Sequence, residues 1–158
     1  NGGHLYRPQV VRRVLDAEGH VVRDFEPELI HEMEVDDDVL RHMRLAARRT
    51  ITIGHTGNLV QMPIVVAGKT GTAEFGTRDA QGHLPIHYWF TAFVPRFAPG
   101  QLGDVEKTDS ELAIVAFAYD ADTRGNAATE IVKYFLQLHY DLDVDLRRPD
   151  LLQNFGGR

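Results

Sequence analysis

Cysteine is absent from the 158-residue sequence, which excludes disulfide bonds and thiolate metal sites but is compatible with any cellular compartment. Long apolar runs are absent as well. The two most apolar runs, 89–94 and 112–119, are far shorter than the roughly 20 residues that a membrane-spanning helix requires. Positive charge is in deficit, because 17 lysines and arginines stand against 23 acidic residues and the formal net charge is −6. This acidic balance argues against nucleic acid as a partner, since nucleic acid selects basic surfaces.

The first residue is asparagine, and no basic segment followed by an apolar one opens the chain. No signal peptide is therefore visible, and we expect the sequence to be a piece of a longer protein. The composition is ordinary for one globular domain, with 43% hydrophobic and 25% charged residues. A chain of this length buries roughly 68–70% of the surface that its unfolded form exposes, so one sizeable core is expected.

Valine-rich runs on both sides of the turn residues 16–19 predict a β-hairpin over 5–25. A helix is expected over about 36–49, because acidic residues begin this segment and arginines end it, in agreement with the helix dipole. The acidic triplet 36–38 is interpreted as the cap and first turn of that helix rather than as a metal site. Residues 127–140 have the apolar stripe of an amphipathic terminal helix.

Three central strands are predicted between these helices. A β-branched run begins a strand over 64–75, and the nearly continuous apolar runs 89–94 and 112–119 are typical of strands that are covered on both faces. No helix-length segment separates the three strands, so they are expected to be antiparallel. The sequence therefore predicts an α+β fold in which an antiparallel sheet is flanked by helices.

The segment Gly68-Lys69-Thr70 after an apolar strand suggests the phosphate-binding loop of nucleotide hydrolases, whose spacing is G-x-x-x-x-G-K-[ST]. Here Pro63 occupies the position of the first glycine. The four intervening residues are strand formers, which do not curl their amides around a phosphate. The nucleotide interpretation is therefore rejected.

Two metal-site patterns fail in a similar way. A calcium-loop pattern that begins at Asp120 has Arg124 and Ile131 at positions where acidic ligands are needed. His83 and His87 have the spacing of a helical zinc pair, but a proline lies between them and no glutamate is adjacent. No metal site is expected.

The pattern that remains is Lys69-Thr70-Gly71-Thr72 at the end of an otherwise apolar strand. Alternate residues of a strand share a face, so Lys69 and Gly71 are expected on one face and Thr70 and Thr72 on the other. Gly71 removes a side chain where another group must approach the backbone. At a sheet edge, such a strand could bind an extended peptide and its carboxylate. The residues alone leave open whether it does so or whether the lysine is merely solubilising.

The segment VAGKTGTAEF, with YWFTAFVP, ELAIVAFAY and a terminal helix downstream of it, resembles the penicillin-binding protein transpeptidase family. The opening NGGHLYRPQVVRRVLDAEGHVV is similar to the segment after the second catalytic motif in class B members. The resemblance covers nearly the whole chain. It implies that residues 1–158 are the C-terminal part of a single transpeptidase domain with part of the penicillin-binding-protein and β-lactamase fold.

The family uses three motifs: S-x-x-K supplies the nucleophilic serine and its lysine, S-x-N supplies a proton-relay pair, and K-T-G lies on the strand that borders the site. This sequence contains a single serine, Ser110, and the residues after it match neither of the first two motifs. The nucleophile is therefore missing, and we expect the chain alone to be inactive.

For the K-T-G segment the resemblance implies specific roles. Lys69 would place a positive charge at the site and hold the relay hydroxyl and the substrate carboxylate, and Thr70 and Thr72 would hydrogen-bond that carboxylate. The backbone amide of Thr72 would form one half of the oxyanion hole. Lys69 and Thr72 are thus the expected catalytic residues, and Thr70, Gly71 and Thr72 are the expected substrate-binding residues.

The implied reaction is serine acyl transfer, which cross-links the stem peptides of peptidoglycan outside the cytoplasmic membrane. The implied partners are the peptidoglycan stem peptide, β-lactams and the remainder of the same transpeptidase domain. No metal or organic cofactor is implied. The parent protein is expected to be anchored in the membrane by residues upstream of this sequence.

A second interpretation is a non-catalytic module that uses the same edge strand to bind a peptide or a protein. In the family, N-terminal strands complete the sheet on the side away from K-T-G. We therefore also expect the strand at 112–119 to have an open edge, which leads either to self-association or to a rearranged edge.

Overall fold

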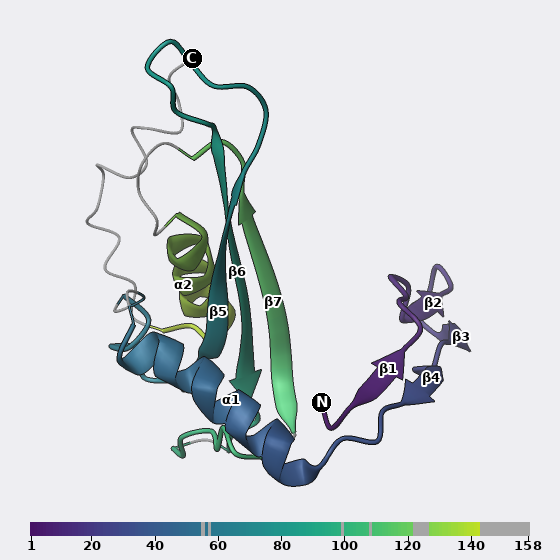
Figure 1. Ribbon diagram of the computed structural model, residues 1–158. Helices are drawn as coiled ribbons and strands as arrows, with labels where there is room; N and C mark the ends of the chain where they lie inside the picture. Colours follow the sequence, from purple (N-terminus) through teal and green to yellow (C-terminus); the bar gives the residue numbers. More distant parts are fainter. Residues whose placement is uncertain (55, 57, 99, 108, 122–126, 143–158) are drawn as a thin grey trace. The chain divides into compact units, whose positions relative to one another are not determined.

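The computed structural model describes residues 1–54, 56, 58–98, 100–107, 109–121 and 127–142. The chain divides into two compact units, with the boundary between Met43 and Arg44. Figure 1 shows the helices and strands along the chain. Each unit has its own strands, and the predicted site lies in the second unit.

The first unit contains two antiparallel strand pairs, one nested inside the other along the chain. The single hairpin predicted over 5–25 is therefore wrong in its outer part, because Leu5 pairs with His31 and not with a residue before 25. The two pairs are separated by Pro8 on one side and Pro27 on the other, and proline cannot donate to a strand ladder. The strands are β1 (His4–Tyr6) with β4 (Leu29–Glu32), and β2 (Arg13–Leu15) with β3 (Val21–Asp24).

Helix α1 covers Asp37–Thr52. Its first turn is capped by Asp36, whose Oδ1 atom accepts the N–H of Asp38 at 2.8 Å. The helix extends beyond the predicted end at 49, because Ile51 is buried in the core of the second unit. Arg48, just before this point, donates to the carbonyl oxygen of Val66 at 2.7 Å and so links the helix to the residue that precedes the first central strand.

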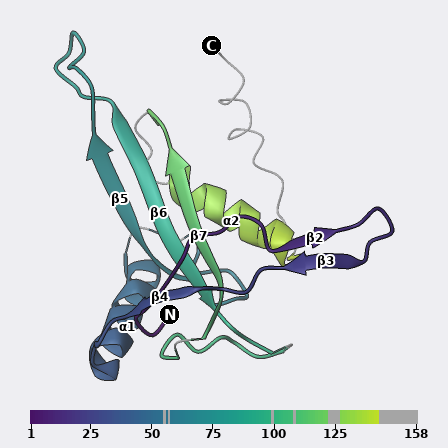
Figure 2. The same cartoon turned by 90° about the vertical axis from the view of Figure 1, so that its right-hand side faces the viewer.

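The second unit is built on a three-stranded antiparallel sheet of order β5-β6-β7. Its strands are β5 (Ala67–Glu74), β6 (Ile86–Pro95) and β7 (Ser110–Ala118). Helix α2 (Ala127–His139) contacts β6 and β7 (Figure 2). The predicted α+β class, with an antiparallel sheet and flanking helices, is confirmed.

Beneath α2, the sheet contributes the centre of the core. Phe90 and Val94 of β6 are fully buried together with Val132 and Leu136 of α2. Ile51 of α1 completes this cluster with Leu59, Ile64 and Val66. Because these side chains come from both helices and the central strand, the position of β6 is fixed by packing on this face.

The prediction that the two apolar strands are covered on both faces is wrong for the described residues. Exposure alternates along β6 and β7, so one face packs into the core and the other is open. On the open face, Trp89 is 41% exposed, Phe117 43% and Val115 62%. A strand with apolar residues on both faces has the same sequence pattern whether or not a covering layer is present.

Tyr140 follows α2 and lies 3.4 Å from Glu111 of β7 through its hydroxyl group. Burial, the negative charge of Glu111 and this hydrogen bond together raise the pKa of Tyr140 to about 12. The phenol hydroxyl donates this hydrogen bond to the carboxylate.

Neither helix in the described ranges is long and apolar enough to span a bilayer.

Candidate active site

Strand β5 lies at one edge of the sheet and, in the described part of the chain, pairs only with β6. Its register with β6 is continuous from Ala67 to Glu74. The same register continues to Phe75, whose N–H donates to the carbonyl oxygen of Pro85 at 3.0 Å. In an antiparallel pair, such hydrogen-bonded positions alternate with positions whose N–H and C=O groups point away from the partner strand. The backbone N–H groups of Thr70 and Thr72 are therefore directed away from β6, toward the open edge.

The side chains of the same strand alternate between the two faces of the sheet. Lys69 pairs with Thr91 and Gly71 with Trp89, both on the open face. Thr70 is opposite Phe90, so Thr70 and Thr72 are on the face that carries the core. This division agrees with the alternation expected from the sequence.

Lys69 nevertheless reaches across the edge of the strand. Its Nζ atom lies 2.8 Å from the carbonyl oxygen of Thr70 and 3.3 Å from the Thr70 hydroxyl oxygen. A cation from one face and a hydroxyl from the other thus meet at the sheet edge, within two residues of the outward N–H of Thr72. The side chain of Lys69 is exposed, so its charge is accessible to a ligand.

A positive charge, a hydroxyl donor and an outward amide are the groups that bind a carboxylate and stabilise an oxyanion. An extended peptide can also pair with the free backbone groups of such an edge. The arrangement can therefore bind a carboxylate ligand and polarise a neighbouring carbonyl group.

The two glycines that flank Lys69 and Thr70 have different surroundings. A Cβ atom at Gly68 would lie 2.5 Å from the carbonyl oxygen of Thr91 and 2.7 Å from Cζ of Phe90. At Gly71, the nearest atom would be Cβ of Trp89 at 3.4 Å, which is ordinary contact. Gly68 is thus required by packing, whereas Gly71 leaves space on the open face that the fold does not use.

We expect Gly68→Ala to destabilise the chain by about 1–3 kcal/mol, because the added methyl group meets fixed backbone. Gly71→Ala is the matched control on the same strand and should change the free energy of unfolding by about 0.5 kcal/mol or less. Urea denaturation of both variants measures the difference. Equal destabilisation by the two substitutions would contradict this assignment.

Five rings form an aromatic patch on the face that carries Lys69, and its members are Phe75, His87, Trp89, Phe117 and Tyr119. The rings of Phe75 and His87 are stacked, with centroids 3.7 Å apart, and those of Trp89 and Phe117 are 4.2 Å apart. The patch was not predicted from the sequence, because both strands were expected to be fully covered. The alternating positions of the rings in the segments 87–89 and 117–119 were the available signal.

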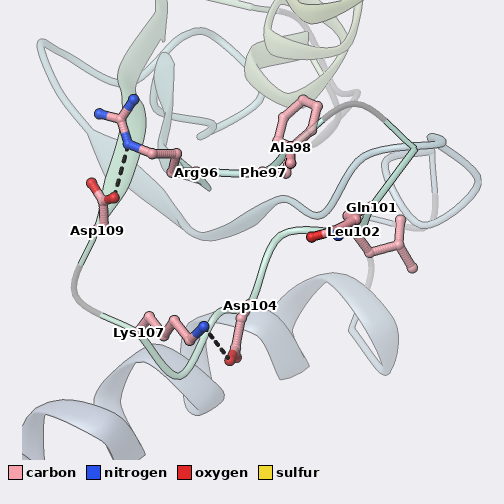
Figure 3. A pocket seen from close by; sticks show the side chains of 8 residues that line it. All are labelled: Arg96, Phe97, Ala98, Gln101, Leu102, Asp104, Lys107 and Asp109. Atoms are coloured by element: carbon pink, nitrogen blue, oxygen red, sulfur yellow. Dashed lines mark hydrogen bonds and ion pairs between the residues drawn. The ribbon is translucent and has the colours of Figure 1, made fainter.

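A cavity of about 310 Å³ lies in the connection between β6 and β7 (Figure 3). Its charged side chains are already paired, Arg96 with Asp109 at 2.8 Å and Lys107 with Asp104 at 4.0 Å. The cavity begins at Arg96, just after the C-terminal end of β6. This end of β6 pairs with Ala67 at the start of β5, before Lys69. Its position and paired charges do not connect it with the Lys69–Thr72 segment.

The structure also shows where the residues of the rejected phosphate-loop and metal-site patterns lie. Lys69 lies inside a strand that continues to Glu74, and not at the start of a helix as a phosphate-binding loop requires. His83 is in the loop between β5 and β6, where it lies 3.6 Å from Asp79, whereas His87 is stacked on Phe75. Residues 122–126 of the calcium-loop pattern lie outside the described residues.

Comparison with known proteins identifies the family. The model of the penicillin-binding protein transpeptidase domain matches residues 1–137, and the chain belongs to this family. Solved structures of similar fold include penicillin-binding protein 2B of Streptococcus pneumoniae strain R6, with a TM-score of 0.66 and 16% identity over 89% of this chain. No match was found among the curated proteins.

Two further structures have the same fold. The D,D-transpeptidase domain of a peptidoglycan glycosyltransferase from Eggerthella lenta has a TM-score of 0.61 and 24% identity over 90% of this chain. PBPA of Mycobacterium tuberculosis has a TM-score of 0.58 and 18% identity, also over 90%. The present chain spans 22% of the pneumococcal protein and 29% of each of the other two. It therefore corresponds to a part of these larger structures.

Proposed function

We propose that this chain is the K-T-G-bearing portion of a class B penicillin-binding D,D-transpeptidase, and that Lys69, Thr70, Gly71 and Thr72 form one wall of its active site. The observation that carries the proposal is the geometry of β5. Thr72 directs its backbone N–H to an open sheet edge, and Lys69 meets the Thr70 hydroxyl at the same edge. These are the groups that recognise a carboxylate and an oxyanion.

In the proposed reaction, a serine hydroxyl from outside these 158 residues attacks the penultimate carbonyl carbon of a stem peptide. The serine proton passes to the relay groups, and the peptide bond breaks as D-alanine leaves with a proton on its amine. An amine from a neighbouring strand then attacks the ester and restores the serine. Thr72 donates its N–H to the oxyanion in both steps, and Lys69 with Thr70 holds the substrate carboxylate.

The chain alone is proposed to be inactive. Its single serine, Ser110, begins β7 opposite Pro95 and is followed by Glu111. No lysine stands three residues after it, so it lacks the base that an S-x-x-K serine uses. Loss of one oxyanion donor typically reduces the rate by about a hundredfold to a thousandfold, and loss of the nucleophile reduces it further.

The proposed partners are the peptidoglycan stem peptide, β-lactams and the remainder of the same transpeptidase domain. The aromatic patch supports the last of these, because contiguous exposed rings of this kind mark surfaces that bind another protein segment. The proposed location is the extracytoplasmic side of the membrane, with the parent protein anchored there. The proposed chemistry uses neither a metal nor an organic cofactor.

A fluorescent penicillin tests the proposal on this chain and on the parent polypeptide that contains it. Covalent labelling of the parent at a serine followed three residues later by lysine, with no labelling of the 158-residue chain, is the expected result. A parent that has no such serine and is not labelled would overturn the enzymatic assignment. It would favour the non-catalytic module that uses the same edge to bind a peptide.

The outer edge of β7 is open in the described part of the chain, because β7 pairs only with β6. We propose that this edge promotes self-association of the 158-residue chain, since unpaired strand edges pair with other chains. Light scattering should detect a dimer or larger species. A monodisperse monomer whose β7 amides are nevertheless strongly protected from hydrogen exchange would contradict this expectation.

A further inference from the structure

The side chain of His87, on β6, contacts residues just beyond the ends of both neighbouring strands. It lies on β6 opposite Ala73 of β5, and its ring is stacked on Phe75 with centroids 3.7 Å apart and planes inclined by 15°. Its Nδ1 atom accepts the N–H of Asp120, just beyond β7, at 3.4 Å. The ring of Tyr119 lies 4.8 Å away. One half-buried side chain therefore joins the end of the edge strand to the end of β7.

The position of the C-terminal end of β5 depends on contacts such as this one. Among the described residues, β5 is hydrogen-bonded on one side only, and Thr72, Ala73 and Glu74 are exposed. Edge strands with few buried contacts open locally at low free-energy cost. Phe75 and its stacked partner are the first ring contact beyond these three residues. On the open face Gly71 has no side chain and Ala73 only a methyl group, and Cβ of Trp89 is the nearest atom to the position that a Cβ at Gly71 would occupy.

An oxyanion donor must be held within a fraction of an ångström of its productive position, since small displacements lower the rate strongly. The outward N–H of Thr72 belongs to the segment between Gly71 and Phe75. We propose that His87 is a positioning residue that fixes this amide by clamping Phe75 against β6. The proposal rests on the proposed function for its catalytic consequence, but the clamp itself is a property of this chain.

The clamp can be tested in the 158-residue chain without any enzymatic activity. His87→Ala should accelerate hydrogen exchange at the inward amides of Gly71 and Ala73 by about tenfold, because the stacked pair is lost. Exchange near the other end of the sheet, at 112–114, should stay unchanged. His87→Phe keeps the stacking without the Nδ1 acceptor. At Gly71 and Ala73 it should therefore show the same protection from hydrogen exchange as the unsubstituted chain. Val115→Ala, on the same open face but outside the aromatic patch, is the matched control.

The catalytic consequence is tested in the serine-containing parent polypeptide. His87→Ala should lower the acylation rate at saturating β-lactam by about tenfold or more while the half-saturating concentration changes little, and His87→Phe should recover the rate. If His87→Ala unfolds the chain, Phe75→Ala removes the other ring of the pair and gives the same comparison. Unchanged exchange at Gly71 and Ala73, or a phenylalanine variant as impaired as the alanine variant, would overturn the proposal. Failure of the proposed function would show instead as acylation that does not depend on Lys69.

Discussion

Replacement of Lys69 by alanine is expected to slow β-lactam acylation of the proposed serine-containing parent by about a hundredfold to a thousandfold. The ammonium group lies 3.3 Å from the Thr70 hydroxyl at the sheet edge, where it can attract the ligand carboxylate and stabilise developing negative charge. Its removal leaves the hydroxyl and the Thr72 amide in place but takes away the charge. The rate of labelling with a fluorescent penicillin at saturating concentration measures the effect.

Lys107→Ala is the control for a general effect of charge, because this lysine is 75% exposed and lies in the connection between β6 and β7. It should leave the acylation rate unchanged. In the 158-residue chain, Lys69→Ala should alter the free energy of unfolding by about 0.5 kcal/mol or less, since the side chain is exposed. Acylation of the Lys69 variant at the normal rate would show that β5 does not border the site.

Phe90→Ala should have the largest effect on stability, a loss of about 3–5 kcal/mol. Phe90 is fully buried in the middle of β6 and lies in the cluster formed with α1 and α2. It is also opposite Thr70, so the cavity left by its removal would open directly beneath the site strand. Chemical denaturation with detection by circular dichroism measures the loss.

The neighbouring residue provides the matched control. Thr91 is on the other face of the same strand and is exposed, so Thr91→Ala should change the free energy of unfolding by about 0.5 kcal/mol or less. A similar loss in both variants would mean that the two faces of β6 are equally packed. That result would contradict a core on one side of the sheet.

The fold class was predictable because three apolar segments follow one another with no room for crossover helices between them. The nested strand pairs of the first unit were not, since the pairing of Leu5 with His31 depends on contacts far apart in the sequence. The coverage of β6 and β7 was also mispredicted. An apolar residue has the same identity whether it faces a core or an unoccupied surface, and periodicity alone does not distinguish the two cases.

At the candidate site, alternation along a strand was sufficient to assign Lys69 and Thr70 to opposite faces. Their meeting at the sheet edge depends on the long lysine side chain and could not be read from spacing. The outward direction of the Thr72 amide depends on which pairs are hydrogen-bonded, and this follows from the bond between Phe75 and Pro85. Packing requires glycine at position 68 but not at position 71. This difference could likewise be seen only from the positions of Phe90, Thr91 and Trp89.

A crystal structure of the serine-containing parent, acylated by a penicillin, is the most direct test of the central claim. We expect the ester carbonyl oxygen to lie roughly 2.7–3.1 Å from the backbone nitrogen of Thr72, with Lys69 and Thr70 next to the ligand carboxylate. An acyl group held by other amides, with the outer edge of β5 covered by another strand, would contradict the account.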